Sequence, residues 1–117
     1  MNALIETIGY LNARLSVPVS SDVPTERPEA FVAIERTSGE EGLVSTPILT
    51  VQAWDADRLE LEGLQSELVG ALLRMPEEVD GVSRVEVSST YYPETANGPL
   101  WPRYVSTARL WCRPSFE

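Results

Sequence analysis

Three pairs of neighbouring carboxylates are the residues of this sequence best suited to acid-base chemistry. The pairs are Glu40 with Glu41, Asp55 with Asp57, and Glu77 with Glu78. Two carboxylates whose pKa values differ can act as general acid and general base, as they do in glycosidases. All three pairs fall in expected loops or at helix ends, where acidic residues aid solubility and suit the helix dipole. We therefore expect no catalytic residue among them.

The residue types that nucleophiles and metal sites use most are scarce. The chain has no histidine and one cysteine, Cys112, so Ser-His-Asp, Cys-His and Cys2His2 zinc arrangements are excluded. Cys112 falls on the apolar side of an expected strand, where cysteine behaves as a small hydrophobe. The segment from Asp55 to Glu60 departs from a calcium loop at Leu59 and Glu60, and helix capping explains it better. We expect no metal and no cofactor.

The basic residues are few and of one type. All nine are arginines, against 18 acidic residues, which gives a net charge of −9. Tight binding of nucleic acid needs basic patches, so it is not expected. Guanidinium groups suit pairing with carboxylates at interfaces. A base-composition bias of the genome also explains the absence of lysine, and both explanations stay open.

Length and composition predict one folded domain over residues 1–117. A chain of 117 residues, 43% of them hydrophobic, buries enough surface for one core. No apolar run approaches the roughly 20 residues of a membrane helix, and the N-terminus has no basic region of a signal peptide. We expect an intracellular protein without membrane contact.

Two segments have the periodicity of amphipathic helices. In residues 2–15 the apolar positions are Leu4, Ile5, Ile8, Leu11 and Leu15. A second helix follows Asp57, which with Glu60 has the form of a capping box. Its apolar positions are Leu61, Leu64, Leu68, Leu72 and Met75, widened by Leu59, Val69 and Leu73. Pro76 is expected to end this helix.

Four short segments rich in strand formers predict a sheet. They are residues 30–36, 46–54, 85–91 and 103–112, and an extended piece precedes them within residues 17–28. Residues 37–42 are expected to be a flexible acidic loop, and the hairpin tip is expected to span residues 38–45. The expected fold is α+β, a mostly antiparallel four- to five-stranded sheet with two helices packed on one face.

Alternation along these strands assigns an unusual set of residues to the face without helices. The set is Thr50, Gln52, Trp54, Arg84, Glu86, Arg109 and Trp111. Trp and Arg are enriched at protein contacts, so a partner or a second copy is one interpretation. A solvated sheet face is the other. Tyr91, Tyr92 and Trp101, near several prolines, are expected either to pack at the sheet edge or to bind a peptide.

Four segments, in order along nearly the whole chain, resemble the tail terminator (tail completion) proteins of long-tailed bacteriophages and prophages. The segments are VSSDVPTERP at residues 19–28, FVAIERT at 31–37, VQAWD at 51–55 and PRYV at 102–105. The resemblance implies a structural protein without enzymatic activity. Its subunits would form a ring, hexameric in this class, on the head-proximal end of the tail tube in the virion, after assembly in the host cytoplasm.

Such a ring would stop growth of the tube and bind the head-tail connector proteins, while DNA passes through its lumen without specific binding. The residues expected at subunit or tube interfaces are Arg36, Gly39, Glu40, Glu41, Gly42, Gln52, Trp54, Arg84, Trp101, Arg103 and Arg109. Two other classes stay open. One is a different head-tail joining or minor tail component, and the other is a small intracellular binding domain or a carboxylate-based hydrolase.

Overall fold

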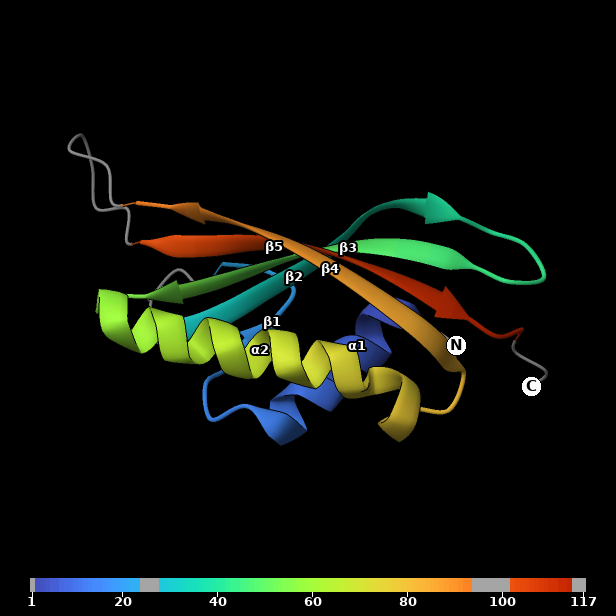
Figure 1. Cartoon of the computed structure of the whole chain (residues 1–117), viewed down its shortest axis with the longest axis horizontal. Helices are drawn as coiled ribbons and strands as arrows, with labels where there is room; N and C mark the ends of the chain where they lie inside the picture. Colours follow the sequence, from blue (N-terminus) through green and yellow to red (C-terminus); the bar gives the residue numbers. More distant parts are fainter. Residues whose placement is uncertain (1, 24–27, 94–101, 115–117) are drawn as a thin grey trace.

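The computed structural model describes residues 2–23, 28–93 and 102–114 and contains two helices and one sheet (Figure 1). The elements are α1 (Ala3–Arg14), β1 (Val19–Ser20), β2 (Ala30–Glu40), β3 (Thr46–Asp55), α2 (Arg58–Glu78), β4 (Val82–Tyr92) and β5 (Arg103–Cys112). The strands lie in the order β1-β2-β3-β5-β4. The expected α+β class and mostly antiparallel sheet are confirmed. The sheet is mixed because β1 runs parallel to β2.

The hairpin of β2 and β3 is longer than the sequence predicts. The predicted loop over residues 37–42 is wrong, because Ser38, Gly39 and Glu40 pair with Ile48, Pro47 and Thr46. A bulge between Arg36 and Ser38 shifts the register, and Gly39 has a φ of 126°, a conformation that glycine adopts without strain. Bulge and glycine let the ladder continue, so the tip that lies outside the β2–β3 pairing shrinks to residues 41–45.

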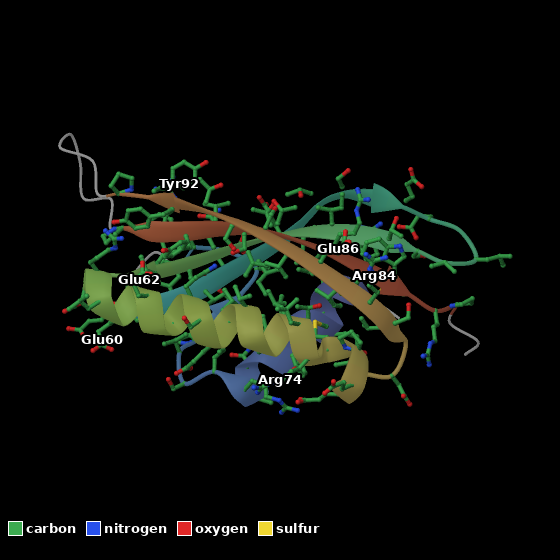
Figure 2. All side chains as sticks on the ribbon, in the orientation of Figure 1. Glu60, Glu62, Arg74, Arg84, Glu86 and Tyr92 are labelled. Atoms are coloured by element: carbon green, nitrogen blue, oxygen red, sulfur yellow. The ribbon has the colours of Figure 1, made fainter. Side chains whose placement is uncertain are left out.

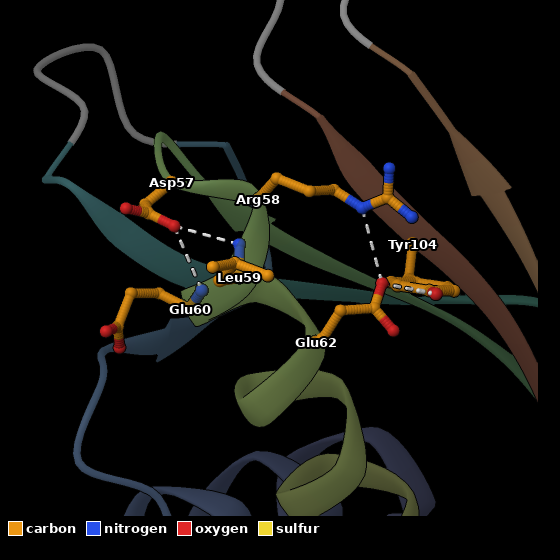
Figure 3. Close-up of polar contacts among 6 residues, drawn as sticks. All are labelled: Asp57, Arg58, Leu59, Glu60, Glu62 and Tyr104. Carbon is orange, nitrogen blue, oxygen red and sulfur yellow. Dashed lines mark hydrogen bonds and ion pairs between the residues drawn. The ribbon is translucent and has the colours of Figure 1, made fainter.

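Helix α2 begins as predicted and ends later than predicted. The Asp57 carboxylate accepts hydrogen bonds from the backbone N–H groups of Leu59 (2.8 Å) and Glu60 (3.2 Å), as Figure 3 shows. Pro76 does not end the helix, which continues to Glu78. A proline removes one N–H donor, and the next turn still closes through the Val79 N–H to the Met75 carbonyl (2.8 Å).

One hydrophobic core joins the two helices to alternate positions of the strands. It includes Leu11, Leu15, Val32, Ile34, Leu49, Val51, Leu61, Leu64, Leu68, Leu72, Met75, Ala108 and Leu110. The predicted stripe of α2 is therefore confirmed. The predicted widening is wrong at Leu59, which is 81% exposed, and at Leu73, which is 52% exposed. Each residue turns a helix by about 100°, which points both side chains off the contact face.

The first helix differs from its predicted stripe at one position. Ile5 is 66% exposed, while Ala3 and Thr7 are buried beside Leu11. Leu4 and Ile8 pack partly against the core, so the contact face is rotated toward Ala3 and Thr7. Neither helix of the described residues combines the length and the apolar character of a membrane span.

Polar contacts attach α2 to the C-terminal half of β4 and the N-terminal half of β5. The Gln65 side-chain amide donates to the hydroxyls of Ser89 and Ser106, at 3.0 Å each. Tyr104 donates to the Glu62 carboxylate at 2.6 Å (Figure 3), and this hydrogen bond raises the pKa of the Tyr104 phenol above its ordinary value. The Arg58 guanidinium lies 3.9 Å from the centroid of the Tyr91 ring. These contacts hold the sheet over the helix.

Candidate interaction face of the sheet

The residues that alternate with the core positions form a second sheet face, which we call the outer face. Cross-strand register places Trp54 opposite Arg103, Glu86 opposite Arg109 and Arg84 opposite Trp111. The outer face includes Phe31, Ala33, Glu35, Ile48, Thr50, Gln52, Trp54, Arg84, Glu86, Ser88, Thr90, Tyr92, Arg103, Val105, Thr107, Arg109 and Trp111. All seven residues that alternation assigned to one face therefore share it.

One end of the outer face is an aromatic cluster with an arginine over it. Phe31 and Trp54 stack with ring centroids 5.6 Å apart and an interplanar angle of 13°. Both are buried although they lie outside the main core. The Arg103 guanidinium lies 5.1 Å from the Trp54 ring centroid and 4.9 Å from that of Tyr92. The sequence indicated Trp54 and Arg103 here but not Phe31 or Tyr92.

The other end carries a second arginine and aromatic cluster. The guanidinium groups of Arg84 and Arg109 lie 4.8 Å and 5.9 Å from the ring centroid of Trp111. Arg84 also forms an ion pair with Glu86. Figure 2 shows Arg84 and Glu86 together on β4, far along that strand from Tyr92. The outer face thus has an arginine and aromatic cluster at each end.

Two of the three outer-face arginines have no carboxylate partner in the described part of the chain. They are Arg103 and Arg109, whose described contacts are with rings. Six positions separate them along β5, which is about 20 Å of strand, and neutral side chains such as Val105 and Thr107 lie between. A guanidinium held flat over a ring keeps N–H donors for a carboxylate. This face suits a partner with acidic and apolar groups.

The remaining predicted interface residues lie at or near the hairpin tip. Arg36 pairs with Glu41, and its Nε donates to the Ser38 carbonyl at 3.3 Å. Glu40 and Gly42 are exposed. The positive φ of Gly39 allows the pairing of β2 with β3 to continue, which is a structural role within the hairpin. Trp101 and the loop around it lie outside the described residues.

The tip contains an apolar pair that the sequence analysis missed. Leu43 is 85% exposed and Val44 is 53% exposed. The base of the tip is held by two backbone hydrogen bonds, from the Ser45 N–H to the Cys112 carbonyl (3.1 Å) and from the Cys112 N–H to the Ser45 carbonyl (2.8 Å). Adjacent apolar residues in a hairpin loop, where polar turn residues are usual, are the signal that points to this pair.

The three carboxylate pairs have structural partners. Asp55, which is buried, accepts a hydrogen bond from the Asp57 N–H at 2.8 Å, and Asp57 caps α2. Glu41 pairs with Arg36, and Glu78 pairs with Arg14 across the two helices. The hydrogen bond from Arg14 lowers the pKa of the Glu78 carboxyl. Within the described residues, none of the three pairs has two unengaged carboxylates for acid-base work.

Metal-binding and thiol chemistry find little support in the described part of the chain. Over residues 2–23, 28–93 and 102–114, no group of three or more Cys, Asp and Glu side chains could hold a metal ion. Burial raises the pKa of the Cys112 thiol above its ordinary value, so this thiol is protonated and a poor nucleophile at neutral pH.

Two hollows meet at Arg109. One of about 620 Å³ is lined by Ile48, Leu73, Val85, Glu86, Val87, Ser88, Thr107 and Arg109. A second of about 350 Å³ is lined by Ser38, Gly39, Glu40, Thr46, Ile48, Arg109 and Trp111. The first is largely apolar in its lining, and Arg109 borders both. The first hollow also takes in Val85 and Val87, whose cross-strand partners are the core residues Leu110 and Ala108, so it extends from the outer face around the edge strand β4.

Fold and surface together define an α+β protein whose sheet has an arginine and aromatic cluster at each end of its outer face. Comparison of the chain with protein-family models and with curated proteins finds no match.

Proposed function

We propose that this protein is a structural component of a phage tail, a tail terminator that acts by assembly. Its subunits form a ring, hexameric in the proposal, on the head-proximal end of the tail tube, stop further addition of tube subunits and provide the joining surface for the head. The observation that carries the proposal is the outer face, on which Arg103 and Arg109 lie over aromatic rings without carboxylate partners among the described residues. Such a face is suited to protein contacts.

The proposed ring uses the two sides of the subunit differently. In the proposed ring both helices lie on the exterior, which leaves the outer face for a neighbouring subunit or the lumen. Three arginines on the outer face favour the neighbour, because DNA slides most easily past a surface that does not bind phosphate. A contact between two different surfaces closes into a ring when its rotation closes.

The proposal assigns the molecule no catalysis and no cofactor. Its partners are copies of itself, the tail tube protein and the head-tail connector proteins, with DNA passing through without specific binding. The engagement of each carboxylate pair in caps or ion pairs disfavours the alternative of a carboxylate-based hydrolase. A different head-tail joining component remains the competing assembly role.

Tube growth in the presence of the purified protein tests the proposal. Polymerising tube protein from the same phage is mixed with this chain, and tube length and end structure are measured by electron microscopy. We expect shorter tubes with a ring at one end. A joining component would instead bind the isolated connector and leave tube length unchanged. Unchanged tubes together with no binding to tube or connector would overturn the assembly role altogether.

A further inference from the structure

The hairpin tip, defined here as residues 41–45, exposes two apolar side chains next to each other. Exposed single apolar residues are common on protein surfaces, and Ile5 and Leu59 are examples in this chain. Leu43 and Val44 differ because they are adjacent and lie at the end of a projecting hairpin, which Figure 1 shows extending beyond the body of the sheet. Their own chain leaves both side chains largely exposed to solvent.

The tip is also held in position. The bridge between Ser45 and Cys112 fixes its base, the Arg36–Glu41 ion pair crosses it, and the Ser45 hydroxyl donates to the Glu41 carboxylate at 3.4 Å. An exposed segment that is already ordered loses less conformational freedom on binding than a flexible one. The tip therefore has the properties of a preformed docking element.

The hollow of about 620 Å³ beside Arg109 offers a matching surface. Leu73, Val85 and Val87 contribute apolar lining from the side of α2, while Ile48 and Arg109 border the hollow on the outer face, so the hollow extends around the edge strand β4. This volume lies within the range of about 300–1,000 Å³ typical of ligand sites, which is ample for a leucine and a valine side chain. The Arg109 guanidinium brings a positive charge without a carboxylate partner in the described part of the chain.

We propose that the hairpin tip of one copy docks into this hollow on a second copy. Leu43 and Val44 enter the apolar lining, and the Glu41 carboxylate, whose side chain is 70% exposed, approaches Arg109. The apolar groups are then complementary, and Arg109 can attract Glu41 because Glu86, which also lines the hollow, is paired with Arg84. These contacts offset the net charge of −9, which otherwise opposes self-association. The tip and the hollow are different surfaces, so the contact is heterologous and can propagate around a ring. This inference rests on the self-association in the proposed function and names its surfaces.

Site-directed cross-linking tests the contact directly. Two variants, Leu43→Cys and Ser88→Cys, are mixed over a range of concentrations and treated with a short bismaleimide. Ser88 is exposed and lines the hollow. We expect a covalent dimer that contains one copy of each variant. Wild type, with its buried Cys112, and a mixture of Leu59→Cys with Ser88→Cys serve as controls, since Leu59 is as exposed as Leu43. Absence of the mixed dimer at every concentration, or efficient dimers of Leu43→Cys alone, overturns the proposal.

Self-association of a tip variant provides the second measurement. Sedimentation velocity compares wild type with Leu43→Ser/Val44→Ser, and Leu59→Ser is the matched control. Losing two buried apolar contacts is expected to weaken association by about tenfold or more, while the control stays at the wild-type value. Tip-dependent association without any effect on tube growth would support this contact and overturn the terminator role. Tube capping that is the same with wild type and with the tip variant would support the terminator role and overturn this contact.

Discussion

Arg84 on β4 and Trp111 on β5 are directly opposite residues of neighbouring strands, and the Arg84 guanidinium carbon lies 4.8 Å from the centroid of the Trp111 ring. The same ring has the Arg109 guanidinium 5.9 Å from its centroid. The two arginines differ in what else they contact. Arg84 pairs with Glu86, so Arg109 is the cation of this cluster that remains for an external carboxylate.

Arg109→Ala is expected to weaken self-association and leave the subunit folded. Arg109 is exposed, and surface substitutions of this kind change the free energy of unfolding by about 0.5 kcal/mol or less. If docking buries the pair of Arg109 with Glu41, removing one partner costs about 2 kcal/mol or more in binding. Sedimentation velocity measures the association and urea unfolding measures the stability. Arg113→Ala, also at an exposed arginine, is the control, and equal association of the two variants would contradict the role given to Arg109.

Gly39→Ala is expected to destabilise the end of the hairpin. Gly39 has a φ of 126°, and an added Cβ would lie 2.6 Å from both the Pro47 Cα and the Thr46 carbonyl oxygen. A side chain in this conformation costs of the order of 1–3 kcal/mol, and these close contacts are with backbone. Because the hairpin end can open locally, hydrogen exchange of the amide groups of residues 38–48 is the measurement, and faster exchange there is the expected result.

Gly42→Ala provides the comparison for the hairpin. Gly42 has its nearest neighbour for an added Cβ at 3.6 Å, the Val44 carbonyl oxygen, which is an ordinary contact. Exchange in this variant should match wild type. If both alanine variants exchange alike, the paired segment of Ser38, Gly39 and Glu40 does not depend on the glycine conformation.

Local sequence rules predicted the elements whose signals lie within a few residues. The stripe from Leu61 to Met75 and the cap at Asp57 define α2 without reference to the rest of the chain, and both are present in the structure. The alternation in β5 likewise gives its two faces, with Ala108 and Leu110 buried and Arg109 exposed. Such patterns depend on periodicity alone.

The structural features that the sequence did not predict depend on neighbouring helices and strands. The extension of β2 past Arg36 requires a partner strand and a bulge, and its residues, which are small or polar and include Gly39, are typical of a loop. Pro76 stays within α2 because the turn beyond it closes on Met75. The apolar side chain of Leu59 fits the predicted helical stripe, but its solvent exposure depends on where the sheet contacts the helix.

The sequence predicted which residues share the outer face, but it did not predict how their side chains contact one another. Alternation assigned Arg84, Arg109 and Trp111 to one face, but the contact of two guanidinium groups with one ring depends on the register of β4 and β5. Register is set by pairing across the sheet, which a single sequence does not encode in a short motif. The exposure of Leu43 and Val44 was likewise not predictable, because it depends on how far the pairing of β2 with β3 extends.

Asp57→Ala is expected to destabilise the protein by about 1 kcal/mol, within a range of about 0.5–2 kcal/mol. The lost carboxylate accepts from two backbone N–H groups, those of Leu59 and Glu60, which have no intrahelical partner at the first turn. Urea unfolding measures the change. Asp80→Ala is the control because Asp80 is exposed and lies in the turn after the helix, and equal losses for both variants would argue against the capping role.

The pairing of Glu78 with Arg14 predicts a stability contribution that is lost in acid. Arg14 donates through Nε to the Glu78 carboxylate at 2.7 Å, and this lowers the pKa of Glu78 below its ordinary value of 4.5. A carboxyl whose pKa falls on folding stabilises the protein fully above its unfolded-state pKa. The contribution disappears as the pH falls through the lower folded-state value. The difference in Tm between wild type and Glu78→Gln should therefore be positive at neutral pH and shrink as the pH falls below 4.5.

Thermal unfolding of wild type, Glu78→Gln and Glu67→Gln over a pH series measures this dependence. Glu67 lines the same groove between the helices, and no ion pair within the described residues involves it. Glu67→Gln is therefore the matched control for the loss of one carboxylate from this groove. A Glu78→Gln offset that stays constant from neutral pH to well below the ordinary glutamate pKa would mean that the ion pair between α1 and α2 adds nothing to stability, as many exposed pairs do.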